Sequence, residues 1–173
     1  GPGDEVIVPA YTYIATPGAV LAAGATPVIA NIDESLTLDV EDVRRKIGPR
    51  TKAILPVHMN GLPCQIQALA DLARERKLLL VEDACQAAGG TFRGKRLGTF
   101  GDAGCFSFNH YKIMTCGEGG ALITDDRRVF DRAFIAHDMG TNFTEYLETL
   151  NEPIFLSHSM RASELSGAIL RVQ

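Results

Sequence analysis

The chain has 173 residues, which is enough for one domain with a sizeable hydrophobic core. Hydrophobic residues make up 46% and charged residues 22%, the proportions of an ordinary globular protein. The net charge is −4 and no basic run occurs, which argues against a nucleic-acid-binding surface. No apolar run is long enough to span a bilayer, so we expect no membrane partner.

The cysteines predict a reducing compartment. They are widely separated and form no Cys-x-x-Cys pair, so we expect free thiols rather than disulfides or a zinc site: Cys64, Cys85, Cys105 and Cys116. The N-terminus lacks the basic and apolar regions of a signal peptide, which favours a cytoplasmic protein. Both ends look truncated, because the sequence begins directly with an expected strand and ends on an apolar helical turn. We therefore expect a fragment of a longer chain.

Short apolar strands alternate with helices in the first half of the chain. The expected strands are Glu5–Val8, Thr26–Ala30, Thr51–Val57 and Leu78–Val81. The expected helices are Tyr11–Ala23 ending at Gly24, Val40–Ile47 capped by Asp39, and the amphipathic Ile66–Arg76. Continuous apolar strands joined by helices are typical of a parallel sheet covered on both faces. Ligands in such sheets bind at the carboxyl ends of the strands.

The second half continues with less regular spacing. We expect a solvated hairpin at Arg93–Arg96, a loop without clear periodicity over 138–153, and no internal repeat. The expected strands and helices are Ala103–Phe108, Ala121–Thr124, Arg127–His137 after the N-cap pair Asp125-Asp126, and Ser159–Gln173.

Two residues carry a chemical signal. Lys112 follows an apolar strand and leads into a glycine-rich turn, and an apolar setting favours the neutral, nucleophilic amine of a Schiff-base lysine. Asp83 stands at the end of another apolar strand. A pyridoxal phosphate enzyme needs a lysine that holds the aldehyde as an imine and a carboxylate that keeps the pyridine nitrogen protonated. The alternative interpretation is a surface lysine and a capping aspartate.

Several blocks of the sequence resemble the sugar aminotransferase family named after DegT, DnrJ, EryC1 and StrS. The specific blocks are Val81–Ala87, Gly98–Phe108, and Lys112 with Gly117–Gly120. Weaker matches are Gly1–Pro9, Tyr11–Tyr13, Pro56–Gly61 and Arg161–Leu165. The resemblance runs almost the whole length in the right order. It implies an α/β fold of the aspartate-aminotransferase type, with three α/β/α layers and a mostly parallel sheet, and the cofactor pyridoxal 5'-phosphate.

The resemblance also implies a role for five residues. Lys112 would form the Schiff base and then move a proton, and Asp83 would pair with the pyridine nitrogen. Gln86 would lie near the ring, Ser107 would bind the phosphate, and Tyr13 would stack on the ring. No metal is implied.

The resemblance further implies that 1–173 is part of the cofactor-binding large domain, truncated at both ends. The N-terminal phosphate-binding segment and the C-terminal small domain of the family would lie outside it. The family's Asn-Tyr-Arg is replaced by Ser159-Met-Arg161. We therefore expect the 173-residue chain to be inactive alone and the whole protein to be a homodimer.

The predicted activity is transfer of an amino group from glutamate or glutamine to a keto-sugar or keto-cyclitol. Cys85-Gln86 and Asn109–Lys112 look more like family members that aminate a cyclitol such as scyllo-inosose than members acting on nucleotide-linked sugars. Two alternatives are a sugar dehydratase, in which histidine replaces the lysine, and a non-catalytic regulatory or structural relative. A dinucleotide-binding domain is discounted, because Pro9–Thr12 follows the first strand where a glycine-rich turn would be needed.

Overall fold

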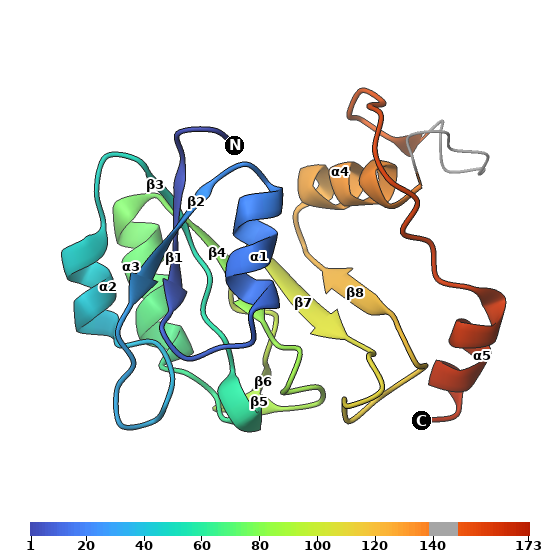
Figure 1. Cartoon of the computed structure of the whole chain (residues 1–173), viewed down its shortest axis with the longest axis horizontal. Helices are drawn as coiled ribbons and strands as arrows, with labels where there is room; N and C mark the ends of the chain where they lie inside the picture. The colour runs from blue at the N-terminus through green and yellow to red at the C-terminus, as the bar shows by residue number, and fades with distance from the viewer. Residues whose placement is uncertain (139–148) are drawn as a thin grey trace.

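The computed structural model of the chain describes residues 1–138 and 149–173, and it shows an α/β fold built on a six-stranded sheet (Figure 1). The strand order is β2-β1-β3-β4-β7-β8. All neighbouring strands are parallel except β7 and β8, which are antiparallel. The strands are β1 Glu5–Pro9, β2 Thr26–Ala30, β3 Thr51–Ile54, β4 Leu79–Asp83, β7 Ala103–Ser107 and β8 Gly120–Ile123. The mostly parallel sheet predicted from the sequence is confirmed.

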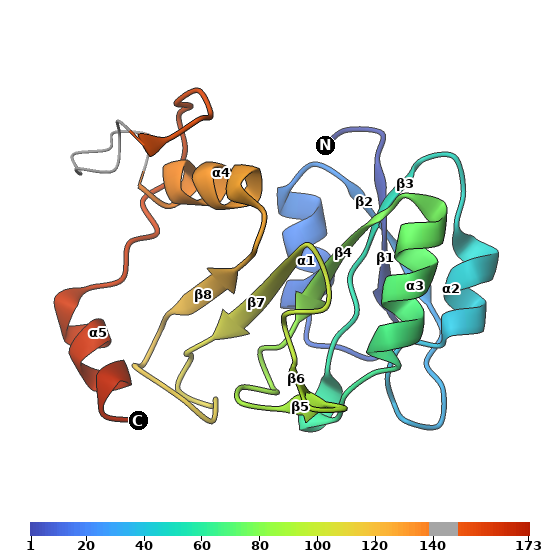
Figure 2. The same cartoon turned by 180° about the vertical axis from the view of Figure 1, so that it is seen from behind.

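Helices cover both faces of the parallel part of the sheet (Figures 1 and 2). Helix α1 (Ala15–Ala22) lies on one face, and α2 (Val40–Lys46) and α3 (Ile66–Arg76) lie on the other. Successive side chains of a strand point to opposite faces, and β1 shows the result: Ile7 joins the cluster under α2 and α3, whereas Val8 packs with Val20 of α1. These two cores make the three layers that the sequence predicts.

The remaining elements are a hairpin, a short 3-10 helix and two further helices, and local sequence features explain where the hairpin turns and where α4 begins. The hairpin β5 (Thr91–Phe92) and β6 (Lys95–Arg96) turns at Arg93 and Gly94, whose φ angles of 50° and 82° suit a tight two-residue turn. Helix α4 (Arg127–His137) is capped by Asp126, which accepts hydrogen bonds from two backbone N–H groups. A short 3-10 helix, η1, spans Met59–Gly61, and α5 (Glu164–Arg171) follows α4 along the chain. The hairpin and the N-cap Asp39 are confirmed, and of the predicted pair Asp125-Asp126 it is Asp126 that caps α4.

The first helix begins later than predicted. We expected it over Tyr11–Ala23, but α1 begins at Ala15. Proline has no N–H and is tolerated only in the first turn of a helix, so a helix starting at Tyr11 would lose a hydrogen bond at Pro17. The correction places Tyr13 in the loop before α1.

The last helix and two strands also differ from the prediction. Helix α5 begins at Glu164 rather than Ser159, because Ser163 caps it by accepting a hydrogen bond from Ser166 N at 3.1 Å. Strand β3 ends at Ile54, before Pro56, and β4 continues to Asp83. Most of the loop predicted over 138–153 lies outside the described residues.

Candidate active site

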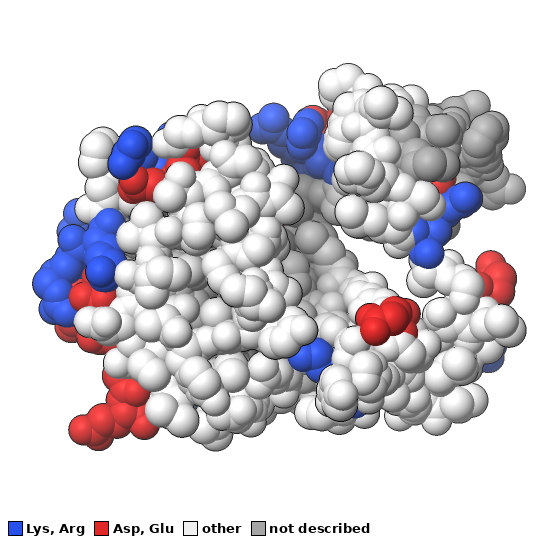
Figure 3. All heavy atoms as spheres, viewed as in Figure 1, with Lys and Arg blue, Asp and Glu red and all other residues white. Residues whose placement is uncertain are grey.

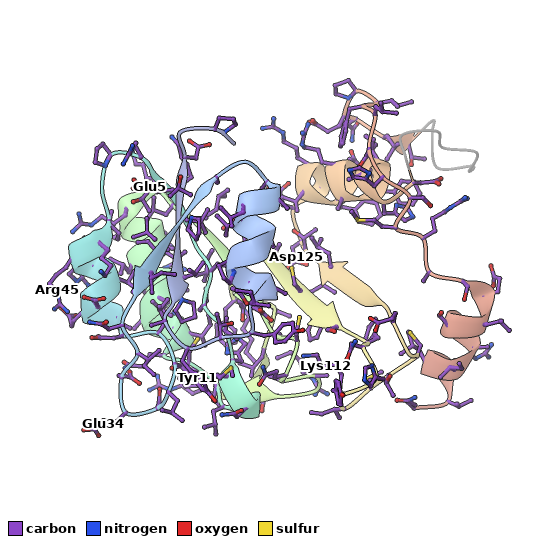
Figure 4. All side chains as sticks on the ribbon, viewed as in Figure 1. Glu5, Tyr11, Glu34, Arg45, Lys112 and Asp125 are labelled. Carbon is purple, nitrogen blue, oxygen red and sulfur yellow. The ribbon has the colours of Figure 1, made fainter. Side chains whose placement is uncertain are left out.

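A cavity of about 600 Å³ opens at the carboxyl ends of β4 and β7. Figure 4 labels Lys112 at this edge of the sheet. All five residues predicted from the sequence line the cavity: Tyr13, Asp83, Gln86, Ser107 and Lys112. The sequence separates them by up to 99 positions, and the parallel topology brings them together. Its other lining residues are Thr12, Ala15, Thr16, Val57, Cys85, Asn109, His110, Tyr111 and Glu118.

Charged groups are sparse around the cavity. Most of the face shown in Figure 3 is uncharged, and its Lys and Arg side chains gather mainly at the edge over α2. There they form exposed ion pairs such as Arg44 with Glu75. The Asp, Glu and Lys side chains that line the cavity are Asp83, Glu118 and Lys112.

The last residue of β4, Asp83, is held through its backbone and its side chain. Its N–H donates to Pro56 O at 2.9 Å, and its carbonyl accepts from His58 N at 3.0 Å. Its carboxylate oxygens accept one hydrogen bond each, Oδ1 from Cys85 N at 3.1 Å and Oδ2 from the Thr16 hydroxyl at 2.8 Å. Both oxygens keep a free lone pair, so the carboxylate can accept a further donor from the cavity.

The thiol of Cys85 shares this environment. Burial and the negative charge of Asp83 raise the pKa of Cys85 to about 12. Burial and the same charge also raise the pKa of Cys105, which pairs with Asp83 across β4 and β7. Both thiols therefore stay protonated near neutral pH and do not act as nucleophiles.

The lysine lies on a loop that is closed by its own hydrogen bonds. Phe108 N donates to Gly119 O at 2.8 Å, and the Asn109 side chain donates to Glu118 Oε1 at 2.7 Å. Lys112 is half-buried in this loop and faces a cavity that carries two carboxylates. The strand ends thus bring polar side chains to the cavity that Lys112 lines, beside apolar ones such as Ala15 and Val57.

The side chain of Gln86 fixes the loop after β3. Its Oε1 accepts from Asn60 N at 2.8 Å, and its Nε2 approaches Met59 Sδ at 3.5 Å. Asn60 has a φ of 55°, a left-handed conformation that asparagine adopts more readily than most residues. The loop could be recognised from the sequence, but this contact could not.

Ser107 and Tyr13 each present a usable group to the cavity. The hydroxyl oxygen of Ser107 accepts from Asn109 N at 3.3 Å, which leaves its proton free to donate. Tyr13 is 67% exposed and stands before α1, so its ring is available to a ligand.

Two further groups were missed by sequence reasoning. Thr16 donates to Asp83 and is only 4% exposed. The sequence feature that could have indicated it is the four-residue spacing of Thr12 and Thr16 at the start of a helix. The buried pair of His58 and Glu82 lies beside the site, with His58 Nε2 and Glu82 Oε2 at 3.1 Å. In the sequence His58 lies within the matched block Pro56–Gly61, and Glu82 gave no signal beyond its position next to Asp83.

The described residues contain no group of three or more His, Cys, Asp or Glu side chains that could hold a metal ion. Within the same part of the chain, every helix is too short or too polar to cross a membrane.

Comparison with known proteins gives consistent matches. The family described as the DegT/DnrJ/EryC1/StrS aminotransferase family matches residues 1–173. A GDP-perosamine synthase of Escherichia coli O157:H7 is 45% identical over 168 residues, which are 96% of this chain and 45% of that protein. An L-glutamine:2-deoxy-scyllo-inosose aminotransferase of Micromonospora echinospora is 41% identical over 145 residues, 83% of this chain and 34% of that protein.

Solved structures of aminotransferases are similar to this fold. The crystal structure of an aminotransferase from Psychrobacter cryohalolentis superposes with a TM-score of 0.91 at 33% identity, covering 99% of this chain and 46% of that one. The chain therefore spans less than half the length of each of these relatives.

Proposed function

The chain belongs to the DegT/DnrJ/EryC1/StrS aminotransferase family, and from this we propose that it is the cofactor-binding part of an enzyme that transfers an amino group from glutamate or glutamine to the keto group of a sugar or cyclitol. The observation that carries the proposal is that Asp83 and Lys112 line one cavity. Asp83 ends β4 and Lys112 lies on the loop after β7, and the chemistry requires the two groups in one site.

The cavity fits pyridoxal 5'-phosphate, the cofactor on which this family depends. Asp83 offers free lone pairs to a protonated ring nitrogen, and Ser107 offers a hydroxyl proton to a phosphate. The exposed ring of Tyr13 offers a surface for stacking. When bound, the cofactor supplies an electron sink that stabilises negative charge on the reacting carbon.

The side chains then have separate tasks. Lys112 Nζ would hold the cofactor through its aldehyde and, once released, carry the proton that is moved during amino transfer. Asp83 would keep the ring nitrogen protonated by its negative charge, and Gln86 would hold the loop after β3 against the cavity. The presence of Lys112 in the cavity counts against both a dehydratase, which would carry histidine there, and a non-catalytic relative.

The relatives are longer than this chain, and their length bears on the domain organisation of the whole protein. We propose that residues 1–173 are part of the large domain of a longer cytoplasmic enzyme, and that further chain and a second subunit complete the phosphate and substrate sites. Residues 1–173 alone would then be inactive, and detectable amino transfer by them would refute this.

The test uses the full-length protein. Pyridoxal 5'-phosphate is added, the visible absorbance of the bound cofactor is recorded, the bond is reduced with borohydride, and the labelled peptide is mapped. We expect the label on Lys112, its loss in Lys112→Ala, and its retention in Lys52→Ala, a change of an exposed lysine on β3. No absorbance band, or a label on another lysine, would refute the proposal.

The substrate class needs a second measurement. Glutamate or glutamine should convert the bound cofactor to its amine form, and the accepted ketone should restore the original absorbance. Keto-sugars linked to nucleotides and free keto-cyclitols are compared as acceptors, because the relatives include enzymes named for both.

A further inference from the structure

A chain of hydrogen bonds runs from the loop before α1 to the carboxylate of Asp83. Thr12 Oγ1 and Thr16 Oγ1 are 2.8 Å apart, and Thr16 Oγ1 donates to Asp83 Oδ2 at 2.8 Å. Thr16 is 4% exposed, so water competes little for its hydroxyl. The two threonines thus connect the rim of the cavity with the group proposed to face the ring nitrogen.

The direction of these bonds follows from the number of protons. A hydroxyl has one proton to donate, and an ionised carboxylate can only accept. Thr16 uses its proton for Asp83, so Thr12 must be the donor to Thr16. A donor whose own oxygen accepts a hydrogen bond is polarised and binds its acceptor more strongly.

The backbone of Asp83 is fixed independently of these hydroxyls by Pro56 and His58. Its Oδ1 accepts from the backbone N–H of Cys85. The Thr16 hydroxyl donates to the other oxygen, Oδ2. Together the two hydrogen bonds fix the rotation of the carboxylate about the Cβ–Cγ bond.

We propose that Thr16 is a positioning residue that fixes the orientation of the Asp83 carboxylate, with Thr12 as the hydrogen-bond donor to Thr16. The inference rests on the proposed function, since it concerns how the cofactor's ring nitrogen is held. Substitution of Thr16 should therefore lower the affinity for the cofactor.

Several titratable groups share this environment and are the same in every variant below. They are Cys85 and Cys105 beside the carboxylate, Glu82 and His58 behind it, and His110, Lys112 and Glu118 around the cavity. A loss of cofactor affinity that appears only when a threonine hydroxyl is removed is therefore caused by the loss of that hydroxyl.

The main variant is Thr16→Val in the full-length protein, which keeps the shape of the side chain and removes the hydroxyl. We expect pyridoxal 5'-phosphate to bind about tenfold more weakly, because that is the usual effect of losing one hydrogen bond to a charged group. Thr16→Ser, which keeps a hydroxyl, should recover the wild-type affinity, and Thr12→Val should show a smaller loss of affinity than Thr16→Val.

The matched control is Thr51→Val. Thr51 is 5% exposed at the start of β3, and its hydroxyl accepts from Gly48 N at 2.9 Å, so the same change is made far from the cavity. Affinity is measured by titration of the absorbance with the cofactor, and thermal unfolding is recorded for each variant. Thr51→Val should lower stability without changing the affinity.

Each outcome is decisive. Cofactor binding by the wild-type protein tests the proposed function by itself. If the wild type binds and Thr16→Val binds equally well, the inference is overturned while the function stands. An equal loss of affinity in Thr51→Val would also overturn it. If Thr16→Val does not fold, wild-type behaviour of Thr12→Val overturns the inference, since that variant leaves Thr16 and its packing in place.

Discussion

The imidazole of His58 and the carboxylate of Glu82 form a hydrogen bond of 3.1 Å between two side chains that are fully buried. Glu82 Oε2 also accepts from Gly98 N at 2.8 Å, and its Oε1 accepts from Phe100 N and Gly101 N. Because Glu82 and Asp83 are neighbours on β4, they point to opposite sides of the strand. One buried carboxylate therefore ties two loops to the strand that ends in the candidate site.

Glu82→Gln should destabilise the protein strongly. A glutamine amide nitrogen is a donor and would face the backbone donors that the carboxylate now satisfies. We expect a loss of about 3 kcal/mol in the free energy of unfolding, measured by urea denaturation of the full-length protein. Glu34→Gln, a change of an exposed glutamate, is the matched control and should leave stability within about 0.5 kcal/mol. Equal stability of the two variants would contradict this account.

The same carboxylate predicts a pH dependence. Burial by itself would raise the pKa of Glu82, but hydrogen bonds from His58 and from three backbone N–H groups outweigh it and lower the pKa below its ordinary value of 4.5. A group with a lowered pKa in the folded state stabilises the protein above its ordinary pKa, and this contribution is lost as the pH falls through the folded value. The stability difference between wild type and Glu82→Gln should therefore shrink as the pH is lowered from about 5 to about 3. A constant difference across this range would be the contrary result.

The loop that meets Glu82 packs directly on β7, and this contact requires glycine. A Cβ atom on Gly104 would collide with the carbonyl oxygen of Gly98. Gly104→Ala should lower the free energy of unfolding by about 3 kcal/mol, because backbone cannot move aside as a flexible side chain can. Gly18→Ala is the counterpart: Gly18 lies within α1 with open space around its Cα, so alanine should stabilise the helix by about 0.5–1 kcal/mol. Similar urea midpoints for the two variants would refute the packing argument.

The sequence predicted the parallel core well because its signals are local. Apolar runs, the N-cap residues Asp39 and Asp126, and the turn at Arg93-Gly94 each reflect the chemistry of a few neighbouring residues. The start of α1 was misplaced because helical periodicity was given more weight than the position of Pro17, which was visible in the sequence.

The site was predicted only in part for a different reason. Asp83 and Lys112 could be recognised from their positions after strands, and the resemblance to a family added Gln86, Ser107 and Tyr13. The contacts of Thr16 with Asp83 and of His58 with Glu82 join segments 67 and 24 residues apart. Such pairs depend on strand order and register, which a single sequence does not reveal.

The ionised state of Asp83 can be tested without any cofactor. Burial and the Asp83 carboxylate together raise the pKa of Cys85 to about 12, so alkylation of this thiol by iodoacetamide should be slow although it lines the cavity. Asp83→Asn removes the charge and lowers the thiol pKa, and each unit raises the thiolate fraction about tenfold. We expect faster labelling of Cys85 in cofactor-free protein, measured by peptide mass spectrometry. The rate should stay below that of an ordinary exposed cysteine, because burial remains.

Cys64, which is 1% exposed and whose pKa is raised chiefly by burial, is the internal control and should stay unlabelled in both proteins. An unchanged Cys85 rate in a folded Asp83→Asn variant would show that the carboxylate carries no charge beside the thiol, and the role proposed for Asp83 would lose its electrostatic basis.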